Sequence, residues 1–177
     1  MTTPFREQVR VATAADRDYL LQAPVIGEAL AGRISRTRYL AFLTQAWHHV
    51  RHTVPLLMAV GARLPDRHAK LQKGLIHYLE EEVGHDDWIL NDIEAAGGDR
   101  YTAAASVPNV ETDAMVAYAW DVAQRRNPLG FFGMVFVLEG TSVALAVRAA
   151  DGIERALGLP ESAFTYLRSH GTLDLDH

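Results

Sequence analysis

Apolar residues recur at spacings of three and four positions over nearly the whole chain, and this spacing restricts the fold more than any other feature of the sequence. Such a pattern is typical of amphipathic helices, because helical turns bring every third or fourth side chain to one face. Ala, Leu, Arg and Glu, which favour helices, dominate the composition. No segment alternates between apolar and polar residues as a half-buried strand does. We therefore expect an all-α protein.

The helix signals divide the chain into a bundle of about seven helices. A chain of 177 residues is long enough for a single domain over 1–177 with a buried core. Pro55 falls inside one helix and is expected to kink it, and the loop between residues 99 and 110 is expected to be irregular. The expected helices cover residues 5–21, 24–32, 36–64, 66–96, 111–125, 128–149 and 151–157, with a last helix that begins at Pro160.

The composition excludes several classes of function. Cysteine is absent, which rules out disulfides, zinc–thiolate and iron–sulfur sites and a cysteine nucleophile. The net charge of −5 gives no basic surface for nucleic acid. The N-terminus lacks the apolar stretch of a signal peptide, and apolar runs such as 134–138 are too short to cross a bilayer. We expect a cytoplasmic protein that binds neither nucleic acid nor membrane.

The end of the chain contains the pattern H-x3-D-x2-H, formed by His170, Asp174 and His177. On a helix, offsets of four and three residues return to nearly the same face, because each residue turns about 100°. Imidazoles and a carboxylate on one stripe are the ligand types of a non-haem iron site. A solvated tail is the competing interpretation.

A second set of potential ligands lies in the acidic stretch 80–87. Glu82 and His85 are three residues apart, so on a continuous helix their side chains meet on one face. Glu-x-x-His is the ligand pair of helical di-iron carboxylate proteins. Glu81, four residues before the histidine, is an alternative first ligand. An acidic face exposed to solvent is the other interpretation.

A third candidate, Glu139, stands in one of the most apolar windows of the chain, 131–142. Burying a carboxylate costs free energy unless it is paired, protonated or bound to metal. Glu139 is therefore a candidate ligand, with an ion pair to Arg148 or Arg168 as the alternative.

Together the three blocks supply carboxylates and imidazoles and no thiol. Six such ligands suit two Fe(II) ions bridged by a carboxylate, with positions left open for oxygen. Manganese is a chemically acceptable substitute, whereas zinc prefers a closed tetrahedral set or three ligands and a water. The residues predicted to bind metal and to act in catalysis are Glu82, His85, Glu139, His170, Asp174 and His177.

These blocks resemble the haem-oxygenase-like di-iron oxidases and oxygenases, often labelled iron-containing redox enzymes. In that family one core helix carries a Glu and a His, a second carries a Glu, and a third carries H-x3-D-x2-H. The similarity runs from about Tyr39 to the end of the sequence. The resemblance implies a haem-oxygenase-like helical bundle with two irons per fully loaded chain. Family members continue beyond the last His, so we expect this chain to lack the C-terminal helices.

The resemblance also implies an activity. The expected enzyme is a metal-dependent oxidoreductase that activates O2 and oxidises a small organic substrate by C–C cleavage, desaturation or N-oxygenation. An amino acid or a fatty acid is the substrate class that the family suggests. Helical bundles of this kind often pair through apolar faces, so a homodimer is one expected assembly.

Other interpretations of the same fold stay open. A cofactorless oxidase would bind substrate and oxygen with histidines and arginines, and haem oxygenase covers its haem with a Gly-rich helix. A thiaminase-type hydrolase needs a cysteine, which is absent. A non-catalytic helical binding or regulatory protein is the alternative from another class. We interpret His48 and His52, which share a face of the expected helix, as satisfied core or surface histidines.

Overall fold

The computed structural model describes residues 3–173, without the side chains of 142–144 and 170–173. These described residues form eleven α-helices and three short 3-10 helices, with no strand among them. The prediction of an all-α protein is therefore confirmed. The helices fall into two compact units. One unit comprises Arg36–Phe131 and Pro160–Tyr166, and the other comprises Met1–Ser35, Phe132–Leu159 and Leu167–His177.

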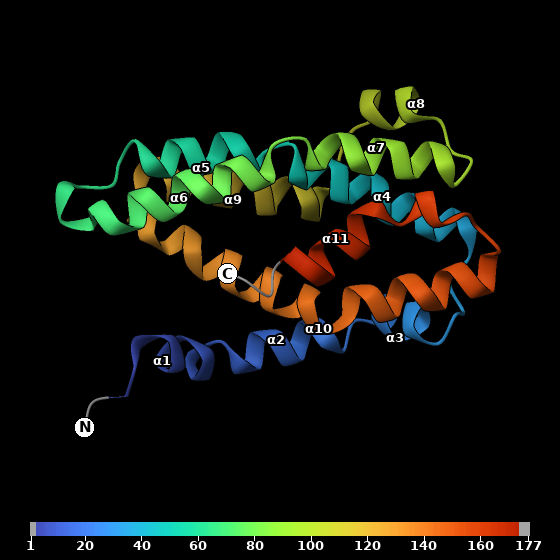
Figure 1. Cartoon of the computed structure of the whole chain (residues 1–177), viewed down its shortest axis with the longest axis horizontal. Coiled ribbons are helices and arrows are strands. Elements are labelled where there is room, and N and C mark those ends of the chain that lie inside the picture. Colours follow the sequence, from blue (N-terminus) through green and yellow to red (C-terminus); the bar gives the residue numbers. More distant parts are fainter. Residues whose placement is uncertain (1–2, 174–177) are drawn as a thin grey trace. The chain divides into compact units, whose positions relative to one another are not determined.

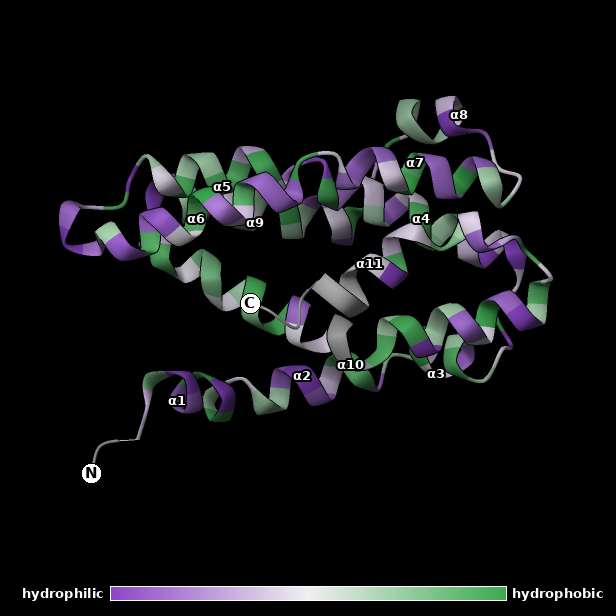
Figure 2. Ribbon diagram, viewed as in Figure 1, coloured by the Kyte–Doolittle hydropathy of each residue, from purple (hydrophilic) through white to green (hydrophobic). Residues whose placement is uncertain are grey.

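The first unit, which we call the α4–α9 unit, contains six α-helices that include the Glu82–His85 segment. Its elements are α4 (Arg36–Val50), α5 (Thr53–Gly61), η1 (Asp66–His68), α6 (Ala69–Glu82), α7 (His85–Ala95), α8 (Arg100–Ala105), α9 (Val110–Arg125), η2 (Pro128–Gly130) and η3 (Glu161–Ala163). Helix α4 packs against α7 and α9, and α5 packs against α6 and α9, as the teal, green and olive ribbons show (Figure 1). Helix α5 is largely apolar and mostly green in Figure 2.

Large side chains from several helices form the core of this unit. Leu43 on α4 and Ile89 on α7 are fully buried. The ring of Tyr39 stacks on Phe164 with 5.3 Å between centroids, and its hydroxyl donates to the carbonyl oxygen of Ala163 at 2.6 Å. Burying a large apolar side chain contributes roughly 1.5–3 kcal/mol. These contacts therefore hold the η3 segment, distant in sequence, against α4.

Two helices that the sequence predicts as continuous are broken. The segment 36–64 is interrupted between α4 and α5, ahead of Pro55. The proline then falls in the first turn of α5, where its missing N–H removes no intrahelical hydrogen bond. The segment 66–96 is interrupted at Val83–Gly84. The helix expected over 36–64 therefore breaks in the turn before Pro55, where a kink is expected, and the expected unbroken helix over 66–96 is wrong.

The loop expected between residues 99 and 110 contains helix α8. Asp99 caps this helix: its carboxylate accepts the backbone N–H of Tyr101 at 2.9 Å and the hydroxyl of Thr102 at 2.6 Å. Such a cap satisfies N–H groups that have no partner within the helix. The expectation of an irregular loop is wrong over these residues.

The second unit, which we call the α10 unit, is built around one long helix. Its helices are α1 (Phe5–Ala12), α2 (Ala14–Leu21), α3 (Pro24–Leu30), α10 (Phe131–Leu157) and most of α11 (Thr165–Leu173). The two helices expected over 128–149 and 151–157 belong to one helix, which Gly152 at their junction does not interrupt. The helix expected over 5–21 is instead divided at Thr13.

Within the α10 unit, α3 and α11 are both fixed to α10. A Cβ added at Gly152 would lie 2.7 Å from the carbonyl oxygen of Ala29, so only glycine allows α3 to approach this closely. On α11, Arg168 forms ion pairs with Asp151 at 3.0 Å and with Glu154 at 2.8 Å.

In the described part of the chain, no single helix is long and apolar enough to cross a membrane. Two segments that meet at an angle of 47°, Pro128–Thr141 and Leu145–Leu157, pass such a test together by length and composition alone. Core helices of globular proteins pass the same test.

Candidate metal centre

A carboxylate and an imidazole are buried side by side where α6 meets α7. Glu82 is the last residue of α6, and His85 is the first residue of α7. Nδ1 of His85 lies 3.2 Å from Oε2 of Glu82, and the side chains of Glu82 and His85 are only 8% and 4% exposed. Acidic and imidazole side chains are seldom buried this deeply without a specific partner or role. The pair is therefore the best-defined part of the candidate site.

The backbone between the two residues produces this arrangement. Val83 is extended, with φ −64° and ψ 120°, and Gly84 has a φ of +93°. A residue with a side chain rarely adopts such a positive φ, so glycine is the residue that this turn requires. The two side chains meet as the sequence predicts, but they meet across a helix break and not along one continuous helix.

Burial around the break is the reverse of the usual pattern. The apolar Val83 is 66% exposed, and the apolar Ile76 on α6 is 60% exposed. The neighbouring carboxylate and imidazole are buried instead. Burying polar groups costs free energy, and leaving a valine exposed gives up the favourable free energy of burying it. This turn is therefore not arranged for stability alone.

The structure separates the two glutamates that the sequence leaves as alternatives. Glu81 points to His77 on the surface of α6, with 3.2 Å between Oε1 and Nε2, and His77 is 71% exposed. Glu82, one residue further, lies beside His85. A rotation of about 100° per residue explains why adjacent glutamates face different surroundings.

Trp88 and Asp92, which the sequence does not mark as functional, lie on the same helix as His85, and Trp88 contacts it. The ring of Trp88 packs on that of His85 with 4.2 Å between centroids, which restricts the orientation of the imidazole. Asp92 follows His85 by seven residues, two helical turns, and is fully buried. The spacing of seven residues from His85 is a sequence signal that could have identified Asp92 as a candidate functional residue.

The carboxylate of Asp92 holds the start of α11. It accepts the backbone N–H of Thr165 at 3.0 Å and that of Tyr166 at 2.8 Å. Burial raises the pKa of Asp92, while the hydrogen bonds from Tyr166 and Thr165 lower it. Negative charge at a helix N-terminus is stabilising, so Asp92 fixes where the helix that carries His170 begins.

The remaining predicted ligands lie in or beyond the other unit. Glu139 is half-buried on α10. Arg168, its expected alternative partner, pairs with Asp151 and Glu154 of the same unit. The backbone of His170 belongs to α11, and its side chain lies outside those described; Asp174 and His177 lie outside the described residues.

Within the described residues, no three His, Cys, Asp or Glu side chains are grouped closely enough to hold a metal ion. Glu82 and His85 supply one carboxylate and one imidazole, the donor types that suit non-haem iron. These two residues therefore fit iron in chemistry and in burial, and the predicted ligand set beyond them stays a prediction.

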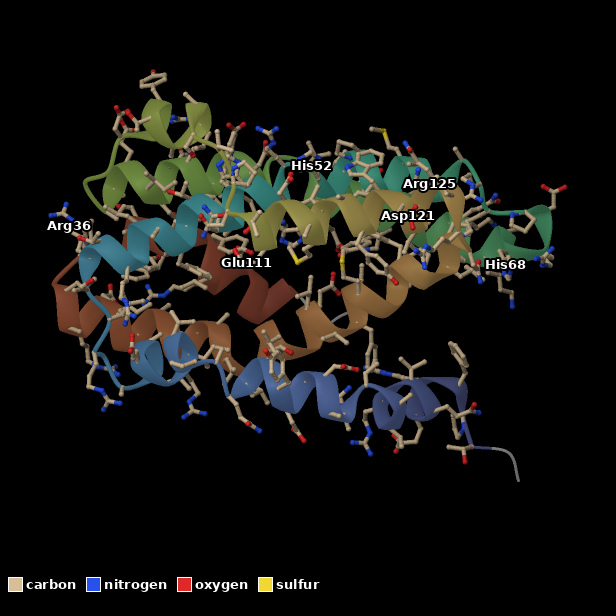
Figure 3. All side chains as sticks on the ribbon, turned by 180° about the vertical axis from the view of Figure 1, so that it is seen from behind. Arg36, His52, His68, Glu111, Asp121 and Arg125 are labelled. Carbon is tan, nitrogen blue, oxygen red and sulfur yellow. The ribbon has the colours of Figure 1, made fainter. Side chains whose placement is uncertain are left out.

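The paired histidines of the first long segment differ from each other. His48 is buried, and its Nε2 lies 2.8 Å from the hydroxyl oxygen of Ser106, so it is a satisfied core histidine. His52 lies in the turn between α4 and α5 and is half-buried, between the teal α5 and the olive α9 in Figure 3. The two belong to different segments, because the chain turns at Arg51–His52, but both side chains line one pocket.

Solved structures share this arrangement of helices. A domain of unknown function with a haem-oxygenase-like fold from Shewanella denitrificans superposes with a TM-score of 0.85 at 24% identity, over 99% of this chain and 76% of the other. A TenA homolog from Pseudomonas syringae superposes with a TM-score of 0.78 at 13% identity, over 98% of this chain and 78% of the other. The chain therefore has a haem-oxygenase-like fold, as the sequence predicts.

The sequence also matches a family model. The model described as iron-containing redox enzyme covers residues 40–177, most of the chain. The chain belongs to this family, which supports an oxidoreductase and, at the level of the family, iron. A search of curated proteins finds no matching relative.

Proposed function

We propose that this protein is a non-haem di-iron oxidase or oxygenase that uses O2 to oxidise a small organic substrate. The proposed ligands are the six predicted residues, which include Glu82 and not its alternative Glu81, and manganese is an acceptable substitute for iron. The family description supports a redox role. The observation that carries the proposal is the buried Glu82–His85 pair, joined by a left-handed glycine.

The described residues would bind the metal, orient the imidazole ligand and exclude water. Glu82 and His85 bind metal only without a proton on the donor atom, so loading the site releases any proton held there. Trp88 keeps the imidazole in one orientation, and burial of the pair keeps bulk water away from it. Iron bound there would supply the binding and reduction of O2, which amino acid side chains do not provide.

The substrate and partners are part of the proposal. We propose a small molecule, with amino and fatty acids as the first classes to assay, and C–C cleavage, desaturation or N-oxygenation as the outcome. O2 is the proposed co-substrate, and a homodimer is the proposed assembly.

Anaerobic titration with Fe(II), followed by desalting and measurement of iron per chain, tests the metal centre. The unaltered protein is expected to retain two irons. Glu82→Gln keeps the shape of the side chain but removes the charge, so it is expected to lower retention by about tenfold or more. The matched control is Glu81→Gln, one residue away and facing His77.

The outcome shows which of the two glutamates binds metal, and it tests the di-iron proposal itself. Equal retention by the unaltered protein and Glu82→Gln, with loss in Glu81→Gln, would assign the ligand to Glu81. Failure of the unaltered protein to retain iron or manganese would overturn the di-iron proposal and favour a non-catalytic helical protein.

The cofactorless oxidase is tested separately. O2 consumption with candidate substrates is measured after exhaustive treatment with a metal chelator. A metal-dependent enzyme is expected to lose activity and regain it on addition of Fe(II), whereas a cofactorless oxidase would be unaffected by either step.

A further inference from the structure

A pocket of about 370 Å³ lies between the end of α4, the α4–α5 turn, the loop after α8 and helix α9, within the α4–α9 unit, and neither Glu82 nor His85 lines it. This volume is at the lower end of the range for small-molecule sites. His52, labelled in Figure 3, is on its wall. The lining residues that matter for recognition are His48, Arg51, His52, Asp113, Val116 and Trp120.

One wall of the pocket is fixed by a defined hydrogen-bond chain. The hydroxyl of Ser106 donates its only hydrogen to the carbonyl oxygen of Ala103 at 2.7 Å. It must therefore accept from His48, whose Nε2 lies 2.8 Å away and carries the proton. Burial, and then the charge of Arg51, lower the pKa of His48. His48 is thus a neutral and immobile part of the wall.

The opposite wall has more donors than acceptors. Nε of Arg51 lies 3.4 Å from Nε2 of His52, and Nε1 of Trp120 lies 3.4 Å from Nδ1 of the same ring. Burial and the charge of Arg51 lower the pKa of His52, so the ring is neutral and can accept only one hydrogen bond. One of the two N–H groups is therefore free to donate to another acceptor, such as a ligand oxygen that replaces solvent.

The charges on the pocket are balanced. Arg51 supplies one positive charge, and its guanidinium stacks over the ring of Trp47 at 4.8 Å from the centroid, which restricts its position. Asp113 on α9 supplies one negative charge. Within the described residues these two side chains form no ion pair with each other. A ligand that carries both signs of charge would match both.

We propose that this pocket binds a small zwitterion, with its carboxylate held by Arg51 and its ammonium group by Asp113. The carboxylate also accepts a hydrogen bond from whichever N–H, that of Arg51 or that of Trp120, is not bonded to His52. The carbon chain between the two charges lies against Val116 and the indole of Trp120. The site is independent of the proposed metal centre, because the two share no residue.

Binding of matched probes to the whole chain tests the charge pattern. The probes are 4-aminobutyrate, butyrate and butylamine, and a series of ω-amino acids from glycine to 6-aminohexanoate finds the best separation of charges. Affinity is measured by titration while the indole N–H resonance of Trp120 is followed, assigned with Trp120→Phe. The zwitterion is expected to bind about tenfold more tightly than either singly charged probe, since each lacks one charged contact.

Two variants then separate the roles of the charges. Arg51→Gln is expected to weaken binding of the zwitterion about tenfold and to leave butylamine as the preferred probe. Asp113→Asn is expected to weaken it about threefold, because an exposed ion pair contributes little, and to leave butyrate as the preferred probe. Both side chains are exposed, so neither change threatens folding. The matched controls are Arg67→Gln and Asp66→Asn, on the exposed helix η1 outside the pocket.

Three results would overturn the proposal: no saturable shift of the Trp120 resonance with any probe, tightest binding of butyrate or butylamine to the unaltered protein, or equal effects of Arg51→Gln and Arg67→Gln.

Discussion

The α4–α9 unit contains two helix breaks that each place a histidine at the turn, and the two are built differently. At Val83–Gly84 a left-handed glycine separates the helices, and His85 is buried against Glu82. At Arg51–His52 the turn stays right-handed, with His52 at φ −93° and ψ −9°, and the histidine lies on an open pocket. The first break presents a buried pair of potential metal ligands in a fixed position, which suits a permanently bound metal. The second presents exposed charges, which suits an exchangeable ligand.

The anchoring of the two breaks differs as well. Helix α7 begins at His85 and, two turns later, Asp92 accepts two backbone N–H groups at the start of α11. Neither α7 nor α5 begins with a side-chain cap, so the hydrogen bonds of Asp92 are what distinguish the first break. Disturbing the first break should therefore cost more stability than disturbing the second.

The largest effect is expected from Asp92→Ala. Removal of the carboxylate leaves two partly buried backbone N–H groups without their acceptor, which costs about 2–3 kcal/mol of unfolding free energy. The measurement is the urea midpoint. Asp87→Ala on the same helix is the control, because its side chain is 72% exposed and lies 3.9 Å from Arg100, so a change of less than about 0.5 kcal/mol is expected. Similar midpoints for the two variants would show that Asp92 is not the anchor of α7.

A smaller effect is expected from Gly84→Ala. The added methyl group meets no atom within 4 Å, so the cost comes from the positive φ alone and should be about 1–2 kcal/mol. Gly74→Ala on α6 is the matched control. It is also free of contacts within 4 Å, but its backbone is helical, so alanine should stabilise by about 0.5–1 kcal/mol. Urea midpoints that move in the same direction would contradict a strained turn at Gly84.

The difference between these glycines explains what the sequence could and could not predict. A lone glycine is tolerated in a helix, so the surrounding helix formers suggested one uninterrupted helix through Gly84. The better signal was the acidic pair Asp86 and Asp87, which falls in the first turn of α7 and favours a helix start. In the same way, Asp99 before a run of alanines marked α8.

The fold class was predictable because helical periodicity is repeated along the whole chain, and packing details do not alter it. The candidate site was predictable only in part. The spacing of Glu82 and His85 identified the pair, but three consecutive glutamates look alike in sequence, and only packing directs Glu81 toward the exposed His77 and Glu82 toward His85. The role of Asp92 depends on residues 73 and 74 positions away in the chain, which no local pattern reveals.

The smallest effect concerns the second break and its response to pH. Burial lowers the pKa of His48 and His52, and the charge of Arg51 lowers both further, while Asp113 opposes this at His52. A lowered pKa means that the unfolded chain binds more protons as the pH falls below the ordinary value of 6.5. The stability that these histidines contribute is therefore present above that pH and is lost as the pH falls through their lower, folded-state pKa values. Stability should decline on acidification from pH 7.5.

The matched substitution for this prediction is His48→Gln, whose amide can still donate to Ser106 but does not titrate. Urea midpoints measured between about pH 7.5 and pH 5 should fall less steeply in this variant than in the unaltered protein. His77→Gln, on the exposed face of α6, controls for the loss of an imidazole elsewhere. The change should be smaller than that of Gly84→Ala, because the amide of glutamine keeps a hydrogen bond to Ser106 and leaves the backbone unaltered. An identical slope in His48→Gln and in the unaltered protein would mean that protonation of His48 is not coupled to unfolding, and that the α4–α5 turn tolerates a charged histidine.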